Sequence, residues 1–138
     1  MSDTSVESLA APLGRAVNIT LWVLQVLLAA FFVFVGFIKL VGFQQEVEAF
    51  AVIGLGQWFR YLTGALEVAG AIGLLIPRLS GLAALGLAGV MVGAVITHLT
   101  VLPPAAFALF PAFLCVVFGL IAWARWPQSK ALAGSRPH

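Results

Sequence analysis

Four long stretches of the chain are almost wholly apolar, and polar residues gather in the gaps between them. The stretches cover about residues 16–40, 58–76, 79–102 and 105–126. Each is near the length of about 20 residues that an α-helix needs to cross the hydrocarbon core of a bilayer. The pattern therefore predicts an all-α integral membrane protein, whose spans form a four-helix bundle within residues 16–126.

The chain outside these stretches is short. Pro77 and Arg78 make a tight turn between the second and third spans, and Pro103 with Pro104 ends the third, because proline interrupts the hydrogen bonds of a helix. Residues 1–15 and 127–138 are polar, and we expect them to form cytoplasmic tails.

The gap between the first and second spans, residues 41–59, has a pattern of its own. Its apolar residues recur at helical spacing and are Phe43, Val47, Phe50 and Ala51. This spacing predicts a short amphipathic helix in the membrane interface. An ordinary loop is the alternative, because Gly54 and Gly56 interrupt the pattern after about three turns.

The composition agrees with a location in the lipid bilayer. Of the 138 residues, 62% are hydrophobic and only 9% are charged, and the mean hydropathy is +1.11. A soluble domain of this size would have about a quarter of its residues charged. The net charge is +2, but the basic residues stand singly at the ends of apolar stretches, which does not indicate nucleic-acid binding.

The distribution of basic residues predicts how the chain is oriented. Loops on the cytoplasmic side of a membrane carry an excess of Lys and Arg. With four spans, one side carries Arg15, Arg78, Arg125, Lys130 and Arg136, whereas the other carries Lys39 and Arg60. We therefore expect both termini in the cytoplasm. The membrane itself is expected to be the inner membrane of a bacterium.

Small residues four positions apart are expected to bring the helices close together. Such pairs are Ala69 with Gly73 on the second span and Gly89 with Gly93 on the third. Helices in lipid gain little from the hydrophobic effect and associate through close packing instead. These four residues should therefore support a compact bundle.

Three ionisable residues inside the spans are candidates for chemistry, because a charge in a membrane is costly unless it is paired or hydrated. Glu67 lies about 10 Å into the second span, on the same helical face as Arg60. His98 lies about 7 Å below Pro103, and Lys39 stands at the outer end of the first span. Three helices thus bring a carboxylate, an imidazole and an amine to the outer half of the bundle, with Arg60 at the mouth.

Each of these residues also has a structural interpretation. Lys39 can extend its ammonium group from a helix end into water. Glu67 can lock the bundle by pairing with Lys39 or Arg60, and His98 can form a hydrogen bond with a backbone carbonyl. One His and one Glu are too few ligands for a zinc site, so we expect no metal.

Other polar residues limit the chemistry further. Cys115 has no partner for an internal disulfide, which excludes a self-contained dithiol exchange enzyme. The sequence contains no haem ligand pair, flavin fingerprint or iron–sulfur cysteine set. Gln25 and Asn18 are interpreted as hydrogen-bonding contacts between helices rather than as a second site.

The candidate residues stand in phrases that resemble the DoxX family of small four-helix membrane proteins, especially its DoxX-like subgroup. Gly36 precedes Lys39 by three residues, as Gly64 precedes Glu67, and His98 follows on the third span. The phrases are FFVFVGFIKL at 31–40, RYLTGALEVAGAIGLLIPRLSGLAA at 60–84 and GAVITHL at 93–99.

The resemblance implies a four-helix bundle and a link to redox chemistry. Some members of the family are subunits of a thiosulfate:quinone oxidoreductase, and others are associated with oxidative-stress partners. Relatives in the wider superfamily resemble assembly chaperones for other membrane proteins, so the resemblance implies no single activity.

Two hypotheses of function follow. In the first, the protein is a quinone-linked redox subunit or accessory of a membrane oxidoreductase complex. Glu67 and His98 relay protons, Lys39 or Arg60 polarises a quinone carbonyl, and electrons come from a partner protein. In the second, it is a non-enzymatic membrane module, either an assembly factor or a subunit that binds lipid or protein. Candidate partners are redox proteins, other membrane proteins and further copies of the chain.

Overall fold

The computed structural model describes residues 14–134, which form helices and the turns between them. The remaining residues of the expected tails, 1–13 and 135–138, lie outside the described part. The all-α prediction is confirmed. The elements are α2 (Arg15–Val41), α3 (Gln44–Ile53), α4 (Gln57–Leu74), α5 (Ser80–Thr100), the 3-10 helix η1 (Ala105–Ala108) and α6 (Leu109–Gly134).

Three segments of the described residues are long and apolar enough to cross a membrane. They are Arg15–Val41, Ser80–Thr100 and Ala105–Pro127. Helix α4 is 18 residues long and carries Arg60 and Glu67, which lower its hydropathy. The chain is therefore an integral membrane protein by the length and composition of α2, α5 and α6.

The predicted helix between the first two spans is present as α3. Gly42 directly follows the end of α2 and Gly54 directly follows the end of α3, and they have positive φ angles of 82° and 84°. At such angles a side chain would be strained, so glycine is the residue that allows the chain to turn here. The helix prediction is confirmed over the alternative of an ordinary loop.

The last helix is longer than the predicted fourth span, and its long apolar segment ends at Pro127. We expected the fourth span to end at Trp126 and a polar tail to follow, but α6 continues to Gly134 with Pro127 inside it. Pro127 lacks a backbone N–H and removes one helical hydrogen bond, which does not end the helix here.

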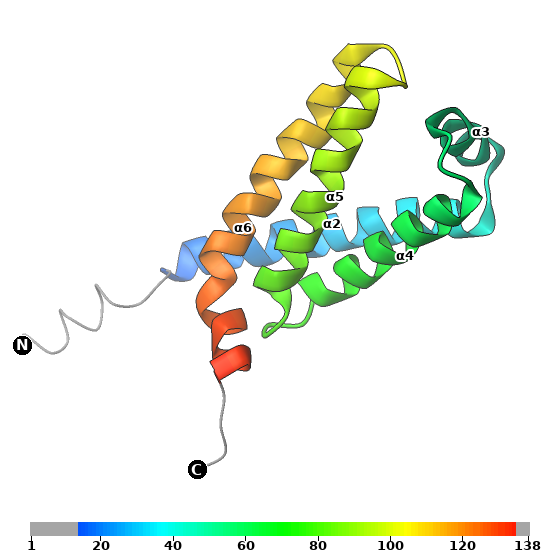
Figure 1. The fold of residues 1–138 in the computed structure, drawn as a ribbon. Coiled ribbons are helices and arrows are strands. Elements are labelled where there is room, and N and C mark those ends of the chain that lie inside the picture. Colours follow the sequence, from blue (N-terminus) through cyan, green and yellow to red (C-terminus); the bar gives the residue numbers. More distant parts are fainter. Residues whose placement is uncertain (1–13, 135–138) are drawn as a thin grey trace, which may run out of the picture.

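The four long helices form two antiparallel pairs that diverge like the arms of a V (Figure 1). Helix α2 packs along α4 to form the first hairpin, and α5 packs along α6 to form the second. At the closed end of the V lie the first residues of α2, the turn at residues 75–79 and the last turns of α6. At the open end, α3 belongs to one arm and the turn before η1 to the other.

The core lies where the two hairpins meet. Phe32 of α2 packs edge-on against Phe118 of α6, with ring centroids 5.3 Å apart. Leu74 and Leu87 are fully buried in the same cluster. Most large apolar side chains outside this core are exposed, as expected for helices that face lipid.

A buried arginine joins the two hairpins at the closed end. Arg125 of α6 is only 1% exposed and donates hydrogen bonds to Oε1 of Gln25 at 2.8 Å and to Oδ1 of Asn18 at 2.6 Å. Gln25 in turn donates to the carbonyl of Leu74 at 2.7 Å, and the guanidinium lies 5.2 Å from the ring centroid of Trp22. Gln25 and Asn18 therefore connect helices, as predicted.

The small residues do not all pack helices together as predicted. A Cβ atom added to Gly73 would lie 2.8 Å from Cβ of Ala83, so α4 and α5 touch there. Gly89 and Gly93, in contrast, have no atom within 4 Å of an added Cβ. The prediction was wrong for these two residues, because this face of α5 borders an open space instead of a helix.

Replacing Gln25 by Leu should destabilise the protein more than a comparable change on the surface of α2. The substitution leaves a donor of Arg125 and the carbonyl of Leu74 buried without partners, which costs about 1–3 kcal/mol of unfolding free energy. Thermal unfolding in detergent measures this loss. Thr20→Val is the control, because Thr20 is exposed and bonds only to Ala16 of its own helix. Equal melting of the two variants would contradict the role of Gln25.

Candidate functional site

The two helices of the first hairpin touch through a pair of glycines. A Cβ atom added to Gly36 would lie 2.8 Å from the carbonyl oxygen of Gly64, and one added to Gly64 would lie 2.9 Å from that of Gly36. These distances are too short for any side chain. The added Cβ of Gly64 would also lie 3.0 Å from Cβ of Lys39, so the lysine stem runs over the glycine.

This close contact brings Lys39 to Glu67. Residues three apart share a helical face, so Glu67 lies one turn beyond Gly64 on the side of α4 that faces α2. Nζ of Lys39 lies 3.1 Å from Oε1 of Glu67 and 3.5 Å from Oε1 of Glu46 on α3. The distance to Glu67 defines an ion pair. Oε1 of Glu67 is buried, and it accepts no hydrogen bond of good geometry from the described residues.

The ammonium group of Lys39 is thus shared by two carboxylates from two helices. Glu67 is 4% exposed, and the side chain of Lys39 is 14% exposed. A buried ion pair is costly to break, because removal of one partner leaves the other as an uncompensated charge. Lys39 and Glu67 therefore hold the two helices together, and both remain candidates for chemistry.

Arg60 has a different place from the other candidates. Its guanidinium donates hydrogen bonds to the backbone carbonyl of Lys39 and to Oε1 of Gln57, and it lies 4.3 Å from the ring centroid of Tyr61. A cation that binds the last carbonyls of a helix is favourably placed. Arg60 therefore fastens the start of α4 to the end of α2, and it does not line the cavity described next.

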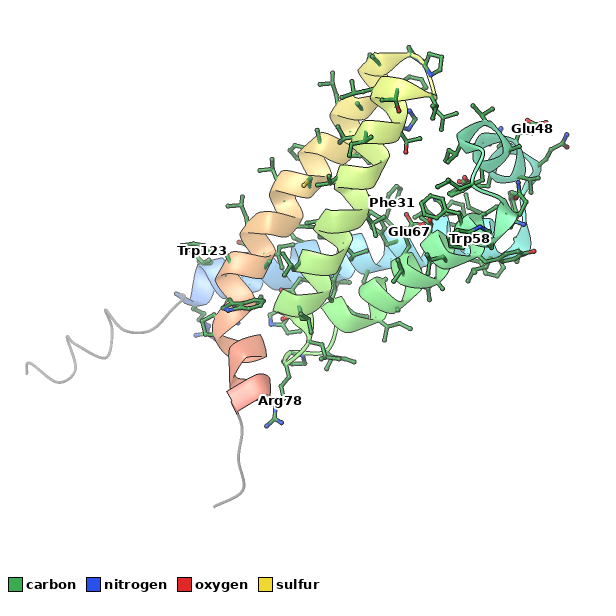
Figure 2. The ribbon with its side chains drawn as sticks, viewed as in Figure 1. Phe31, Glu48, Trp58, Glu67, Arg78 and Trp123 are labelled. Carbon is green, nitrogen blue, oxygen red and sulfur yellow. The ribbon has the colours of Figure 1, made fainter. Side chains whose placement is uncertain are left out.

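A cavity of about 950 Å³ occupies the angle between the two hairpins. Lys39, Glu46 and Glu67 line it from the first hairpin and α3, and His98 lines it from α5. Figure 2 shows Glu67 on the side of α4 that faces this angle. The structure thus brings Lys39, Glu67 and His98 to one cavity, and adds Glu46.

The two walls of the cavity differ in their side chains. The wall formed by α5 includes Gly86, Gly89 and Gly93, each of which has no atom within 4 Å of an added Cβ. The facing wall carries large apolar side chains such as Phe50 and Leu62. A volume of this size with a few polar groups among an apolar lining suits an amphiphilic small molecule.

His98 presents one ring nitrogen to its own backbone. Nδ1 lies 3.1 Å from the carbonyl oxygen of Leu102, which only accepts, so we assign the ring proton to Nδ1. In the neutral imidazole, Nε2 then carries a lone pair and accepts. The ring packs edge-on to Phe107, with centroids 6.2 Å apart.

The contacts of Glu46 and Arg125 were not predicted from the sequence. Glu46 reaches Lys39 only because α3 folds back over the end of α2, and no local pattern specifies that direction. Arg125 stands at the end of an apolar stretch like a basic residue facing the cytoplasm, but it points between helices. The polar residues Gln25 and Asn18, one heptad apart on α2, were the signal for a buried partner. Within the described residues, no three metal-ligating side chains of His, Cys, Asp or Glu come together.

The chain is thus a small helical membrane protein with a cavity of about 950 Å³ between two hairpins. The sequence model of the DoxX-like family matches residues 23–121, and the chain belongs to this family. The match includes Lys39, Glu67 and His98 and all of the cavity lining. No curated protein and no solved structure matches the chain.

Replacing Lys39 by Met should destabilise the protein more than replacing Glu67 by Gln. Loss of the ammonium leaves two carboxylates without a counter-charge, which costs about 3–5 kcal/mol of unfolding free energy. In the Glu67→Gln variant, Lys39 keeps Glu46 as a partner, so the loss should be smaller. Thermal unfolding measures both variants, with Arg78→Met as the control on an exposed turn residue. The reverse order of stability would rule out Lys39 as the shared partner.

Proposed function

We propose that the chain crosses the membrane four times, with α4 as the crossing that is less apolar. At 1.5 Å per residue its 18 residues span about 27 Å, close to the thickness of the hydrocarbon core. Its charged residues, Arg60 and Glu67, are buried against α2 rather than turned to lipid. The four long helices then form one transmembrane unit, and α3 lies at the membrane interface.

The same proposal places the closed end of the V in the cytoplasm of a bacterial inner membrane. Arg15 and Arg78 lie at this end, while Lys39 lies toward the other end, consistent with more basic residues on the cytoplasmic side. Both termini are then cytoplasmic, and the mouth of the cavity beside α3 lies toward the outer surface.

We propose that the cavity binds a lipid-soluble molecule of the quinone class, and that the protein serves as a subunit or accessory of a membrane oxidoreductase. One observation carries the proposal: a cavity of about 950 Å³ in a membrane protein is lined by Lys39 and Glu67 from the first hairpin and by His98 from α5, so that three helices contribute polar groups to it. A ring with polar substituents fits beside these groups. A second cavity of about 450 Å³ with a wholly apolar lining shares Leu66 and Val90 with the first and offers room for an apolar tail.

Each polar residue has a defined part in this proposal. A bound quinone would supply two-electron, two-proton redox chemistry. Glu67 and His98 can hold or pass protons beside the ring, since carboxylate and imidazole side chains are common proton carriers in enzymes. Lys39 positions Glu67, and Arg60 fixes the helix end that carries Lys39. Electrons would come from a partner protein.

The alternative is a non-enzymatic membrane module, either an assembly factor or a lipid- or protein-binding subunit. The contacts of Lys39 with Glu67 and of Arg60 with the carbonyl of Lys39 favour it, because they hold α2 and α4 together without any ligand. The two functions differ in what occupies the cavity. A protein purified from membranes with a stoichiometric quinone would favour the first.

Filling the cavity should abolish quinone binding without disturbing the fold. Gly93→Leu places a side chain into the open space of the cavity wall, where no atom lies within 4 Å of an added Cβ. We expect the affinity for a decyl-substituted benzoquinone to fall at least about tenfold, equivalent to about 1.4 kcal/mol. Equilibrium binding to the protein in nanodiscs measures the change.

The matched control is Gly119→Leu on α6. Gly119 is exposed, also has open space around an added Cβ, and does not line the cavity. Both substitutions raise helix propensity by a similar amount, so any difference between them reports on the cavity. Unchanged binding in the Gly93→Leu variant, or absence of binding by the unmodified protein, would refute quinone binding at this site.

A further inference from the structure

The hydroxyl protons along the cavity are already used within the helices. Oγ1 of Thr63 donates to the carbonyl of Phe59 at 2.8 Å, and Oγ1 of Thr97 donates to the carbonyl of Gly93 at 2.8 Å. Each threonine oxygen therefore faces the cavity with its lone pairs only. Nδ1 of His98 is likewise occupied by its backbone bond, which leaves Nε2 as an acceptor.

The charged side chains of the cavity also supply more hydrogen-bond acceptors than donors. Among the described residues that line it, Lys39 is the only Lys or Arg, and its Nζ lies 3.5 Å from Oε1 of Glu46 and 3.1 Å from Oε1 of Glu67. Carboxylates only accept hydrogen bonds, so acceptors outnumber donors. Among the described lining residues, the one side-chain amide is that of Gln45, which lies on the exposed side of α3.

One of these acceptors is buried and lacks a hydrogen bond. Oε1 of Glu67 has Lys39 as its ionic neighbour, but no described donor approaches it with hydrogen-bond geometry. Buried polar atoms in folded proteins are nearly always hydrogen-bonded, and an unfilled acceptor costs free energy. A donor supplied by a ligand would satisfy it.

We propose that the cavity selects molecules whose head group donates hydrogen bonds, such as a hydroquinone or another phenol, over molecules of the same shape that only accept. This inference rests on the proposed function, since it names the form of the quinone class that the site prefers. A site rich in acceptors discriminates strongly against a ligand that lacks donors, because its polar atoms then stay unpaired. Tighter binding of the reduced form raises the two-electron midpoint potential of the bound couple, by about 30 mV for each tenfold preference.

The test compares 4-decylphenol with 4-decylanisole, its methyl ether. In the ether a methyl group replaces the hydroxyl proton, so its oxygen can only accept, and neither probe undergoes reversible quinone chemistry. Binding to the full chain in nanodiscs is measured per lipid, with empty nanodiscs subtracted to remove partitioning. We expect the phenol to bind at least about tenfold more tightly.

The outcomes separate the two proposals. Equal binding of the probes, or tighter binding of the ether, overturns the selectivity and leaves the cavity as an amphiphile site. Failure of both probes to bind overturns the selectivity and the proposed function together. A preference for the phenol that survives in the Gly93→Leu variant overturns the assignment to this cavity.

A matched pair of variants locates the acceptors. Glu46 lines the cavity, whereas Glu48, two residues along the same helix, is exposed, accepts from Gln44 and does not line it. Glu46→Gln should reduce the preference for the phenol to about threefold or less, because the amide also donates. Glu48→Gln makes the same change of charge and should leave the preference unaltered. Equal effects of the two variants would contradict a direct role for the carboxylate of Glu46.

Discussion

The close approach of α2 and α4 at Gly36 and Gly64 is the contact on which the rest of the site depends. Because neither residue has a side chain, the two backbones come near enough for Lys39 to lie over Gly64 and reach Glu67. In lipid, helices associate through such close contacts and through polar pairs rather than through apolar burial. The ion pair of Lys39 and Glu67 therefore depends on the close backbone contact that the two glycines allow.

The second hairpin contributes the opposite side of the cavity in a different way. Helix α5 turns a face of glycines toward the first hairpin, and the angle between the hairpins leaves that face unfilled. Polar atoms then reach the cavity from both arms of the V, but the hydroxyl and imidazole protons among them already form hydrogen bonds with backbone carbonyls. The ion pair arises from the tight packing of α2 against α4, whereas the open space arises from the divergence of the two hairpins.

The sequence predicts the helices well because span length and proline position depend on local chemistry alone. The spacing of glycines before Lys39 and Glu67, and the depth of His98, also place these residues at a common level. The angle between the hairpins is not predictable in this way, since the same spacing of Gly89 and Gly93 suits either a helix contact or an open wall. Glu46 and Arg125 were missed because their partners lie on other helices, and only the path of the chain decides where they point.

The buried cluster around Arg125 has a mechanical consequence because of where it lies. It joins α6 to α2 near the vertex of the V, far from the cavity mouth. Helix α5 is about 30 Å long at 1.5 Å per residue, so a rotation of one degree at the vertex moves its far end by about 0.5 Å. A small change in the packing around Arg125 would therefore produce a much larger change in the distance between the far ends of the two hairpins, and so in the width of the cavity mouth.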